Sequence, residues 1–441
     1  MAFDPAYATV FPRTAAVEGG RLRIGGCDAQ ELTRRFGSPL YVFDETELRE
    51  TCREYVREFT SRYAQTTVTY AAKAYLSRWM AGVARDEGLA MDVVSGGELA
   101  VALAGGMPAE RCVFHGNNKS EEELREAVGA GIGRVIVDNF HELELLDRVA
   151  RTLGRRQAIL LRLSPGVDAH THAKTTTGIL DVKFGLPIGT GAAEAAIVEA
   201  LRLPGVELLG LHCHLGSPIF ELEPYELANE VMVGFAAGMR AKHGFELREY
   251  SPGGGFAVQY LREAPAPPTA AYAEAVVVSF LRQCEAYGLT PPRLIVEPGR
   301  SLVARAGVAL YTVGARKDVE GLRTWVSVDG GMADNIRPAI YDARYEAVVV
   351  NRADEEPVET VTIAGKYCES GDLLVKDARL PRTEPGDVIA LPAAGAYCIP
   401  MASNYNMALK PAVVVVRDGD ARLIRRRETY ADLVATEVDG P

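Results

Sequence analysis

Short β-rich runs alternate with segments of helical period from about residue 66 to residue 297, and this alternation constrains the fold more than any other feature of the sequence. Repeated strand–helix units of this kind build a parallel sheet. Eight strand-like runs follow one another: TVTYAAK (67–73), LAMDVV (89–94), RCVFHG (111–116), RVIVDN (134–139), AILLRLS (158–164), LLGLHCH (208–214), LREYSPG (247–253) and RLIVEPG (293–299). Eight strands with helices between them predict an α/β fold, a closed (β/α)8 or TIM barrel.

An open, doubly wound sheet is the other fold that such units can build. The early part of this chain has no strand followed by a GxGxxG turn and a helix, the arrangement by which such sheets bind dinucleotides. The barrel is therefore the favoured fold.

The sequence changes character after about residue 306. Runs of β-branched residues such as WVSVDGG, ETVTIAG and PAVVVVRDGD are separated by turn residues, with almost no helical period. They predict a second domain that is mostly β, of the β-barrel or sandwich kind. The first forty residues also contain strand-like runs, RLRIGG and SPLYVFD, which either join this domain or lead into the barrel.

Composition excludes several classes of function. A net charge of −11 gives no general basic field for nucleic acid, and no stretch is apolar over the length of a membrane span. Seven scattered cysteines without a CxxC motif argue against a disulfide framework. The N-terminus lacks a basic segment followed by an apolar core. We expect a cytoplasmic protein whose partners include neither nucleic acid nor membrane.

Nearly every predicted barrel strand ends in a polar group. Stability alone gives little reason for this, whereas the reactive groups of a barrel lie at the carboxyl ends of its strands. The residues concerned are Lys73, Asp92 with Ser95, His115 with Asn117, Asp138, Arg162, His214, Gly253 to Gly255, and Glu297 with Arg300. The pattern predicts an active site at this rim.

Three of these groups point to a phosphate-bearing cofactor. The amine of Lys73 would reach the barrel mouth, where its pKa can be lowered for use as a nucleophile, although an isolated lysine there is ordinarily a solvated surface residue. The glycines at 253–255 can cradle a phosphate after the seventh strand. Glu297 and Arg300 can present a carboxylate to a cationic ring nitrogen and a guanidinium to an anion, or form a buried ion pair.

A metal-dependent barrel hydrolase is an alternative from another class. His212 and His214 share one face of a strand, and an HxH pair is a common set of metal ligands. One of the two is instead expected to be a core histidine that is hydrogen-bonded in place. The hydrolase hypothesis also leaves the glycine run without a role. His170 and His172 lie in a long loop and are expected to be solvated or to face the substrate.

Taken in order, the motifs resemble those of the fold-type III, alanine-racemase-like pyridoxal-phosphate decarboxylases, and within them the enzymes that act on meso-diaminopimelate. The resemblance covers nearly the whole chain. Its marks are YAAKA (70–74), DVVSGGEL (92–99), VFHGNNKS (113–120), PGVDAHTH (165–172), TTGILDVKFG (176–185), HCHLGS (212–217), GGGF (253–256), EPGRSLVA (297–304), IRPAIYDA (336–343), CESGD (368–372) and SNYN (403–406).

The resemblance implies a cofactor-binding barrel over residues 43–305 and a β domain formed by 1–42 with 306–441. It implies a homodimer with shared active sites and a carboxy-lyase that converts meso-diaminopimelate to L-lysine, the last step of lysine biosynthesis. A decarboxylase of D-ornithine, D-lysine or another dibasic amino acid, and a cofactor-binding homologue without activity, are the alternatives. Tyr75 and Pro218 depart from the usual asparagine and glutamine, which weakens the inference for the substrate.

Residue roles also follow from the resemblance. Lys73 would bind pyridoxal 5'-phosphate as a Schiff base, His214 would stack on its ring, and Glu297 would keep its nitrogen protonated. Phosphate and ring would be held by Ser217, Gly254, Gly255, Gly299 and Arg300. The substrate would contact Arg300, Arg337, Tyr341, Glu369 and Tyr405, the last of which also touches the cofactor. Cys368 of the partner chain would donate the proton, whereas the other six cysteines are expected to be buried and structural. No metal is expected.

Overall fold

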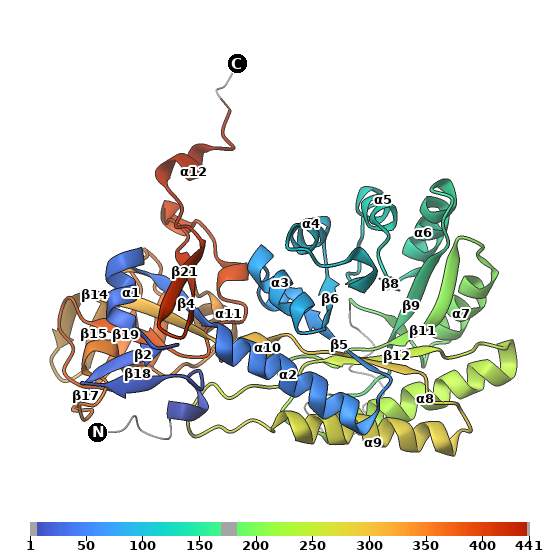
Figure 1. The fold of residues 1–441 in the computed structure, drawn as a ribbon, viewed down its shortest axis with the longest axis horizontal. Coiled ribbons are helices and arrows are strands. Elements are labelled where there is room, and N and C mark those ends of the chain that lie inside the picture. Colours follow the sequence, from blue (N-terminus) through green and yellow to red (C-terminus); the bar gives the residue numbers. More distant parts are fainter. Residues whose placement is uncertain (1–6, 169–182, 439–441) are drawn as a thin grey trace. The chain divides into compact units, whose positions relative to one another are not determined.

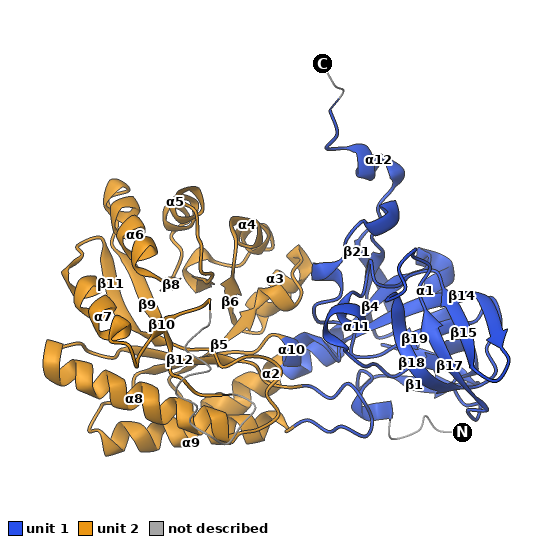
Figure 2. Ribbon diagram, turned by 180° about the vertical axis from the view of Figure 1, so that it is seen from behind, with its two compact units in different colours: residues 1–51, 258–266, 300–441 blue, residues 52–257, 267–299 orange. Residues whose placement is uncertain are grey.

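The computed structural model describes residues 7–168 and 183–438, and the chain forms two compact units. One unit, here called the barrel unit, consists of residues 52–257 and 267–299. The other, here called the β unit, consists of residues 1–51, 258–266 and 300–441 (Figure 2). None of the helices in the described parts has the length and apolar character that a membrane crossing requires.

The barrel unit is built on eight parallel strands. They are β5 (Thr66–Ala71), β6 (Ala90–Val93), β7 (Cys112–Phe114), β8 (Arg134–Val137), β9 (Gln157–Ser164), β11 (Val206–His212), β12 (Glu249–Gly254) and β13 (Arg293–Glu297). Each strand pairs with its neighbours in parallel, and β13 pairs with β5, which closes the ring. A short strand, β10 (Leu186–Pro187), lies beside β9. The predicted (β/α)8 barrel is confirmed.

Helices cover the outside of this ring (Figure 1). They are α2 (Glu45–Arg62), which begins in the β unit, and α3 (Arg78–Asp86), α4 (Gly96–Ala104), α5 (Glu121–Ala130), α6 (Phe140–Thr152), α7 (Ala192–Arg202), α8 (Glu223–His243) and α9 (Thr269–Ala286). Polar residues cap the starts of α3, α4, α5 and α6, as at Ser120, whose hydroxyl accepts from the amide of Glu123. Such caps fix where each loop ends.

The barrel interior is filled by side chains. Val113, Ile136, Leu160 and Ile295 come from four different strands and form one buried cluster. This packing closes the barrel below its carboxyl rim, so that the polar groups are left at the mouth.

The β unit contains two sheets, and this confirms the predicted mostly β domain. The strands β1 (Ala16–Glu18), β2 (Arg21–Ile24) and β3 (Cys27–Asp28) form the small one. The large one contains β4 (Leu40–Asp44), β14 (Gly307–Val319), β15 (Arg323–Val328), β16 (Val348–Val349), β17 (Glu359–Ala364), β18 (Leu373–Leu380), β19 (Val388–Leu391), β20 (Ala412–Arg417) and β21 (Asp420–Arg425). The short helices α1 (Ala29–Phe36), α10 (Arg300–Val303), α11 (Arg337–Tyr341) and α12 (Tyr430–Val434) complete the unit.

The N-terminal segment joins this β unit. Strand β4 lies between β14, with which it is antiparallel, and β20, with which it is parallel. Its residues are fully buried because the apolar run LYVFD packs on both faces. The SPLYVFD run therefore joins the β domain, which is one of the two possibilities that the sequence left open.

Candidate active site

The carboxyl ends of the barrel strands carry polar residues, as the sequence predicted. Lys73 lies in a single 3-10 turn, η2 (Ala72–Ala74), directly after β5, and it is exposed between buried alanines. The amide of Ala71 donates a hydrogen bond of 3.0 Å to the carbonyl of Pro298, just after β13. This bond joins the ends of the first and last barrel strands, so that Lys73 and Glu297 come from neighbouring strands at one rim.

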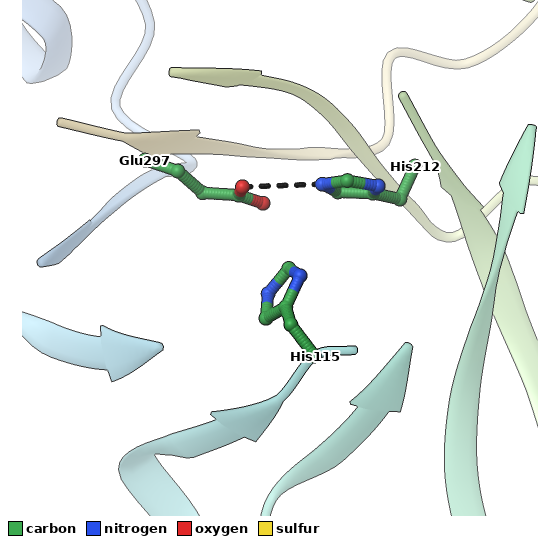
Figure 3. Close-up of side chains that lie close together, drawn as sticks. All are labelled: His115, His212 and Glu297. Carbon is green, nitrogen blue, oxygen red and sulfur yellow. Dashed lines mark hydrogen bonds and ion pairs between the residues drawn. The ribbon is translucent and has the colours of Figure 1, made fainter. Parts of the chain in front are cut away.

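Glu297 accepts hydrogen bonds inside the barrel mouth. Ser251 Oγ, on β12, donates to Oε1 at 2.6 Å, and His212 Nε2, at the end of β11, lies 3.1 Å from Oε2 (Figure 3). The ring of His115, just after β7, meets the ring of His212 edge-on with centroids 5.1 Å apart. Nε2 of His115 is 3.1 Å from Oδ1 of Asp92. Four buried titratable groups thus form a cluster in the mouth, in which His115, His212 and Glu297 offer atoms within 4.8 Å of one another.

The charged or neutral state of each of these four groups follows from its burial and from its neighbours. Burial alone would raise the pKa of Glu297, but the neighbouring His212 and His115 and the bonds from His212 and Ser251 outweigh it and hold the pKa below the usual range. Burial lowers the pKa of His212 and of His115 to about 4. Burial, with Glu297 nearby, raises the pKa of Asp92 well above normal. At neutral pH Glu297 is therefore ionised, beside two neutral histidines.

The glycine run at 253–255 leaves no room for side chains. A Cβ on Gly254 would lie 1.9 Å from the carbonyl oxygen of Glu297, and one on Gly255 would lie 2.2 Å from that of Gly216. Gly255 also has a φ of 94°, which side chains rarely allow. Only glycine lets the backbone follow this path, which brings the end of β12 against its neighbours.

His214 and Ser217 lie in the loop that follows β11. The amide of Gly254 donates to Nδ1 of His214 at 3.4 Å, which ties this loop to the glycine run. Burial, together with Lys73 and Arg162, lowers the pKa of His214 to about 3, so its ring is neutral. Ser217 is exposed. A neutral flat ring and a hydroxyl thus stand beside the glycine run.

Gly299 and Arg162 complete the predicted residues of the barrel unit. A Cβ on Gly299 would lie 3.0 Å from the Cβ of Ala71, so this glycine allows the turn after β13 to approach β5. Arg162, at the end of β9, stacks over the ring of Phe184 at 4.4 Å and lies 3.9 Å from Asp138. Both strand-end residues, Asp138 and Arg162, are therefore placed at the rim.

The remaining predicted site residues belong to the β unit: Arg300, Arg337, Tyr341, Cys368, Glu369 and Tyr405. The structure brings two of these together, because the hydroxyl of Tyr405 donates to the carbonyl of Cys368 at 3.4 Å. The amide of Cys368 donates to the side chain of Asn406 at 3.1 Å. The other six cysteines are buried, as predicted, and Cys368 is exposed. A thiol and a phenol therefore share one surface of this unit.

Arg337 is a buried cation, with 6% of its surface exposed. Its guanidinium donates to the hydroxyl of Tyr345 and lies over the ring of Tyr260, 4.9 Å from the centroid. Within residues 7–168 and 183–438, no carboxylate forms a salt bridge with it. A buried guanidinium without a counter-ion is well suited to an anionic ligand.

The residues that could bind a metal ion in the structure differ from the HxH pair that the sequence suggested. Among the described residues, His115, His212 and Glu297 offer three atoms within 4.8 Å of one another, whereas His214 is not part of this group. His212 is buried and bonded to Glu297, as expected for one histidine of the HxH pair. The pair itself does not supply the two ligands.

Some residues were missed by sequence reasoning or lie outside the description. Ser251 was not singled out, because its position inside a strand carries no sequence signal apart from its inward phase on β12. His170, His172 and most of the loop around them lie outside the described residues.

Comparisons with known proteins agree with this geometry. Residues 46–304 match the family described as "Pyridoxal-dependent decarboxylase, pyridoxal binding domain". The chain is 46% identical to diaminopimelate decarboxylase of Bacillus subtilis over 95% of both proteins, and 43% identical to that of Mycobacterium tuberculosis over 97% of this chain and 98% of the relative. The crystal structure of diaminopimelate decarboxylase from M. jannaschii matches with a TM-score of 0.92 and 36% identity, over 98% of this chain and 99% of that one. The similarity extends over both units.

Proposed function

The chain belongs to the family of pyridoxal-dependent decarboxylases, and from that premise we propose that it is a carboxy-lyase that converts meso-diaminopimelate to L-lysine and carbon dioxide, the last step of lysine biosynthesis. The observation that supports this substrate is that the chain is at least 42% identical, over at least 94% of its length, to relatives named diaminopimelate decarboxylase. The cofactor of this family is pyridoxal phosphate.

The residues of the barrel unit fit that cofactor. An ionised carboxylate, Glu297, is buried where a cationic ring nitrogen needs a partner, and two donors hold it there. The glycine run carries no side chains of its own that would keep a phosphate from its backbone, and an exposed lysine follows β5. These groups come from neighbouring strands of one rim, which supports a single site.

Each residue of this chain has a separate task in the proposed reaction. When bound, the cofactor supplies an electron-poor ring that accepts the electron pair released as carbon dioxide leaves. Lys73 would hold the cofactor covalently through its amine. Glu297 keeps a proton on the ring nitrogen, and His214 covers the ring face. Ser217, Gly254, Gly255 and Gly299, with Arg300, hold the phosphate and ring.

The β unit supplies the substrate contacts in this proposal. Arg300, Arg337 and Tyr341 bind a substrate carboxylate, and the burial of Arg337 without an acidic partner among the described residues supports its part. Glu369 recognises the distal end of the substrate, and Tyr405 contacts both substrate and cofactor. Cys368 donates a proton to the carbon that has lost carbon dioxide, and its exposure supports a role in the partner's site.

The proposal extends to the homodimer and to the residue ranges of the two domains. We propose a cytoplasmic homodimer in which each active site uses Cys368 of the partner subunit. The barrel domain spans residues 43–305, close to the 46–304 matched by the family model, and the β domain combines 1–42 with 306–441.

The test is release of carbon dioxide by the purified holoenzyme with meso-diaminopimelate, D-ornithine, D-lysine and L-lysine offered separately. The Lys73→Ala variant is the control for catalysis by free cofactor. Release from meso-diaminopimelate alone is the expected result. Release from D-ornithine or D-lysine instead would move the substrate to another dibasic amino acid, and no release from any of them would refute the proposal.

A further inference from the structure

Residues 258–266 leave the barrel unit and return to it. They lie between β12 and α9, two barrel elements, yet they pack within the β unit (Figure 2). The guanidinium of Arg262 stacks over the ring of Tyr7 at 4.2 Å and lies 3.4 Å from a carboxylate oxygen of Glu346. The amide of Arg262 donates to the same carboxylate at 2.9 Å. The segment is thus anchored in the β unit by contacts of its own.

Tyr260, in this segment, touches two arginines in different ways. Nη1 of Arg300 donates a hydrogen bond of 2.8 Å to the hydroxyl of Tyr260. The guanidinium of Arg337 lies 4.9 Å from the centroid of the same ring. Tyr345 meets the ring of Tyr260 at 88°, with centroids 5.6 Å apart, and its hydroxyl accepts from Arg337. One phenol therefore links two cations that are 37 residues apart in sequence.

These contacts orient the arginines without neutralising them. A phenol hydroxyl accepts a hydrogen bond through its lone pairs, and an aromatic face attracts a cation through its quadrupole. A carboxylate in the place of Tyr260 would pair with either guanidinium and take the charge that an anionic ligand needs. Tyr260 contacts Arg300 through its hydroxyl and Arg337 through its face, and neither of these two contacts neutralises a guanidinium.

We propose that Tyr260 is a positioning residue that sets the two guanidinium groups for one substrate carboxylate. The inference rests on the proposed function in that it assigns Arg300 and Arg337 to carboxylate binding. Guanidinium groups bind carboxylates best when their orientation is fixed beforehand. Tyr260 acts on binding of the substrate carboxylate and not on the bond-breaking step.

The experiment separates the two contacts of Tyr260. Tyr260→Phe removes the hydroxyl that accepts from Arg300 and keeps the ring under Arg337, whereas Tyr260→Leu removes both. Tyr430→Phe, at a tyrosine of the same unit that is 78% exposed, is the matched control. KM and kcat for meso-diaminopimelate are measured on each holoenzyme, together with the dissociation constant of glutarate, a dicarboxylate that carries no amine.

Loss of a hydrogen bond to a charged group predicts that Tyr260→Phe raises KM and the glutarate dissociation constant about tenfold. Tyr260→Leu should raise both further, and kcat should change less than about threefold. The control should match the wild type. The Phe variant keeps the test valid if the Leu variant fails to fold.

The role of Tyr260 would be overturned if glutarate did not bind to the wild type. It would also be overturned if Tyr260→Phe had the same KM and the same glutarate affinity as the wild type. A fall in kcat alone would also contradict it, since that would place the effect on the chemical step. A different outcome concerns the proposed function alone. If the wild type binds glutarate through Tyr260 but releases no carbon dioxide from meso-diaminopimelate, the substrate is wrong and the positioning role stands.

Discussion

His212 Nε2 lies 3.1 Å from Oε2 of Glu297, and this contact fixes both the tautomer of the histidine and the direction of the carboxylate. The neutral ring has its single proton on Nε2, because Glu297 is ionised and can only accept. Nδ1 has no hydrogen-bond partner among the described residues. His212 therefore donates a hydrogen bond to Glu297, and together with Ser251 it keeps the carboxylate ionised and fixes its orientation.

Replacing His212 tests this contact. His212→Leu should weaken pyridoxal phosphate binding about tenfold or more, since the buried carboxylate loses a donor. His212→Gln keeps an amide that can donate, so its loss should be smaller. Titration of the apoenzyme with pyridoxal phosphate, followed by absorbance, gives the dissociation constants. Equal affinity in the Leu variant and the wild type would show that the contact is incidental.

Glu297→Gln preserves the shape of the side chain and removes its charge. We expect kcat to fall by about a hundredfold or more, because a neutral amide cannot hold a proton on the ring nitrogen. Cofactor binding through Lys73 should persist, which visible absorbance reports. Ser251→Ala, which removes one donor and leaves the charge, should cost much less. A Gln variant with normal kcat would exclude the role proposed for Glu297.

Lys73→Ala should abolish both turnover and the absorbance of the lysine-bound cofactor, whereas Cys368→Ala should keep the absorbance and lose turnover. If the active sites are shared between two copies, subunits of the two variants mixed in equal amounts should regain about a quarter of wild-type activity, because half of the dimers are mixed and each has one intact site. Activity is measured after unfolding and reassembly of the mixture. No recovery would contradict the sharing, and turnover in both variants would contradict the mechanism.

Lys119 and Glu142 form a buried ion pair of 2.6 Å, separate from the cluster around Glu297. Lys119 also donates to the carbonyls of Gly116 and Ile136, so it ties the loop after β7 to β8. Lys119→Met should destabilise the protein by about 3–5 kcal/mol because Glu142 is left buried and unpaired. Urea unfolding measures the change. The double variant with Glu142→Gln should recover part of it, and a Met variant as stable as the wild type would be unexpected on this argument.

The neutral histidines make stability depend on pH. Burial lowers the pKa of His212 and His115 from the ordinary 6.5 to about 4, so the unfolded chain takes up protons in a range where the folded protein does not. Stability should therefore fall as pH falls from about 6.5 to about 4, by a few kcal/mol for the pair. Urea unfolding of the apoenzyme at several pH values tests this. A His115→Gln variant should show a shallower slope, and a flat wild-type profile would contradict the burial argument.

The barrel was predictable because each strand–helix unit has a local period and each strand end is marked by a polar residue such as Lys73 or Glu297. The pairing of β4 with β14 and β20 was not, since nothing in the run LYVFD identifies partners that lie hundreds of residues away. Tyr260 was missed for a similar reason. Its segment has no regular period, and its importance comes from arginines that only folding brings to it. Sequence motifs marked the residues with reactive groups, but not the neutral residues that orient them.

The position of β4 has a consequence for synthesis of the chain. This apolar strand leaves the ribosome early, but β14 begins at residue 307 and β20 at residue 412, so both of its edges stay without their partners while the whole barrel is being made. An unpaired apolar strand is a site for association with other chains. The nascent chain therefore needs protection of β4, by a chaperone or by slow collapse onto the early barrel helices. The folded enzyme no longer needs it, because β14 and β20 then cover both edges of the strand.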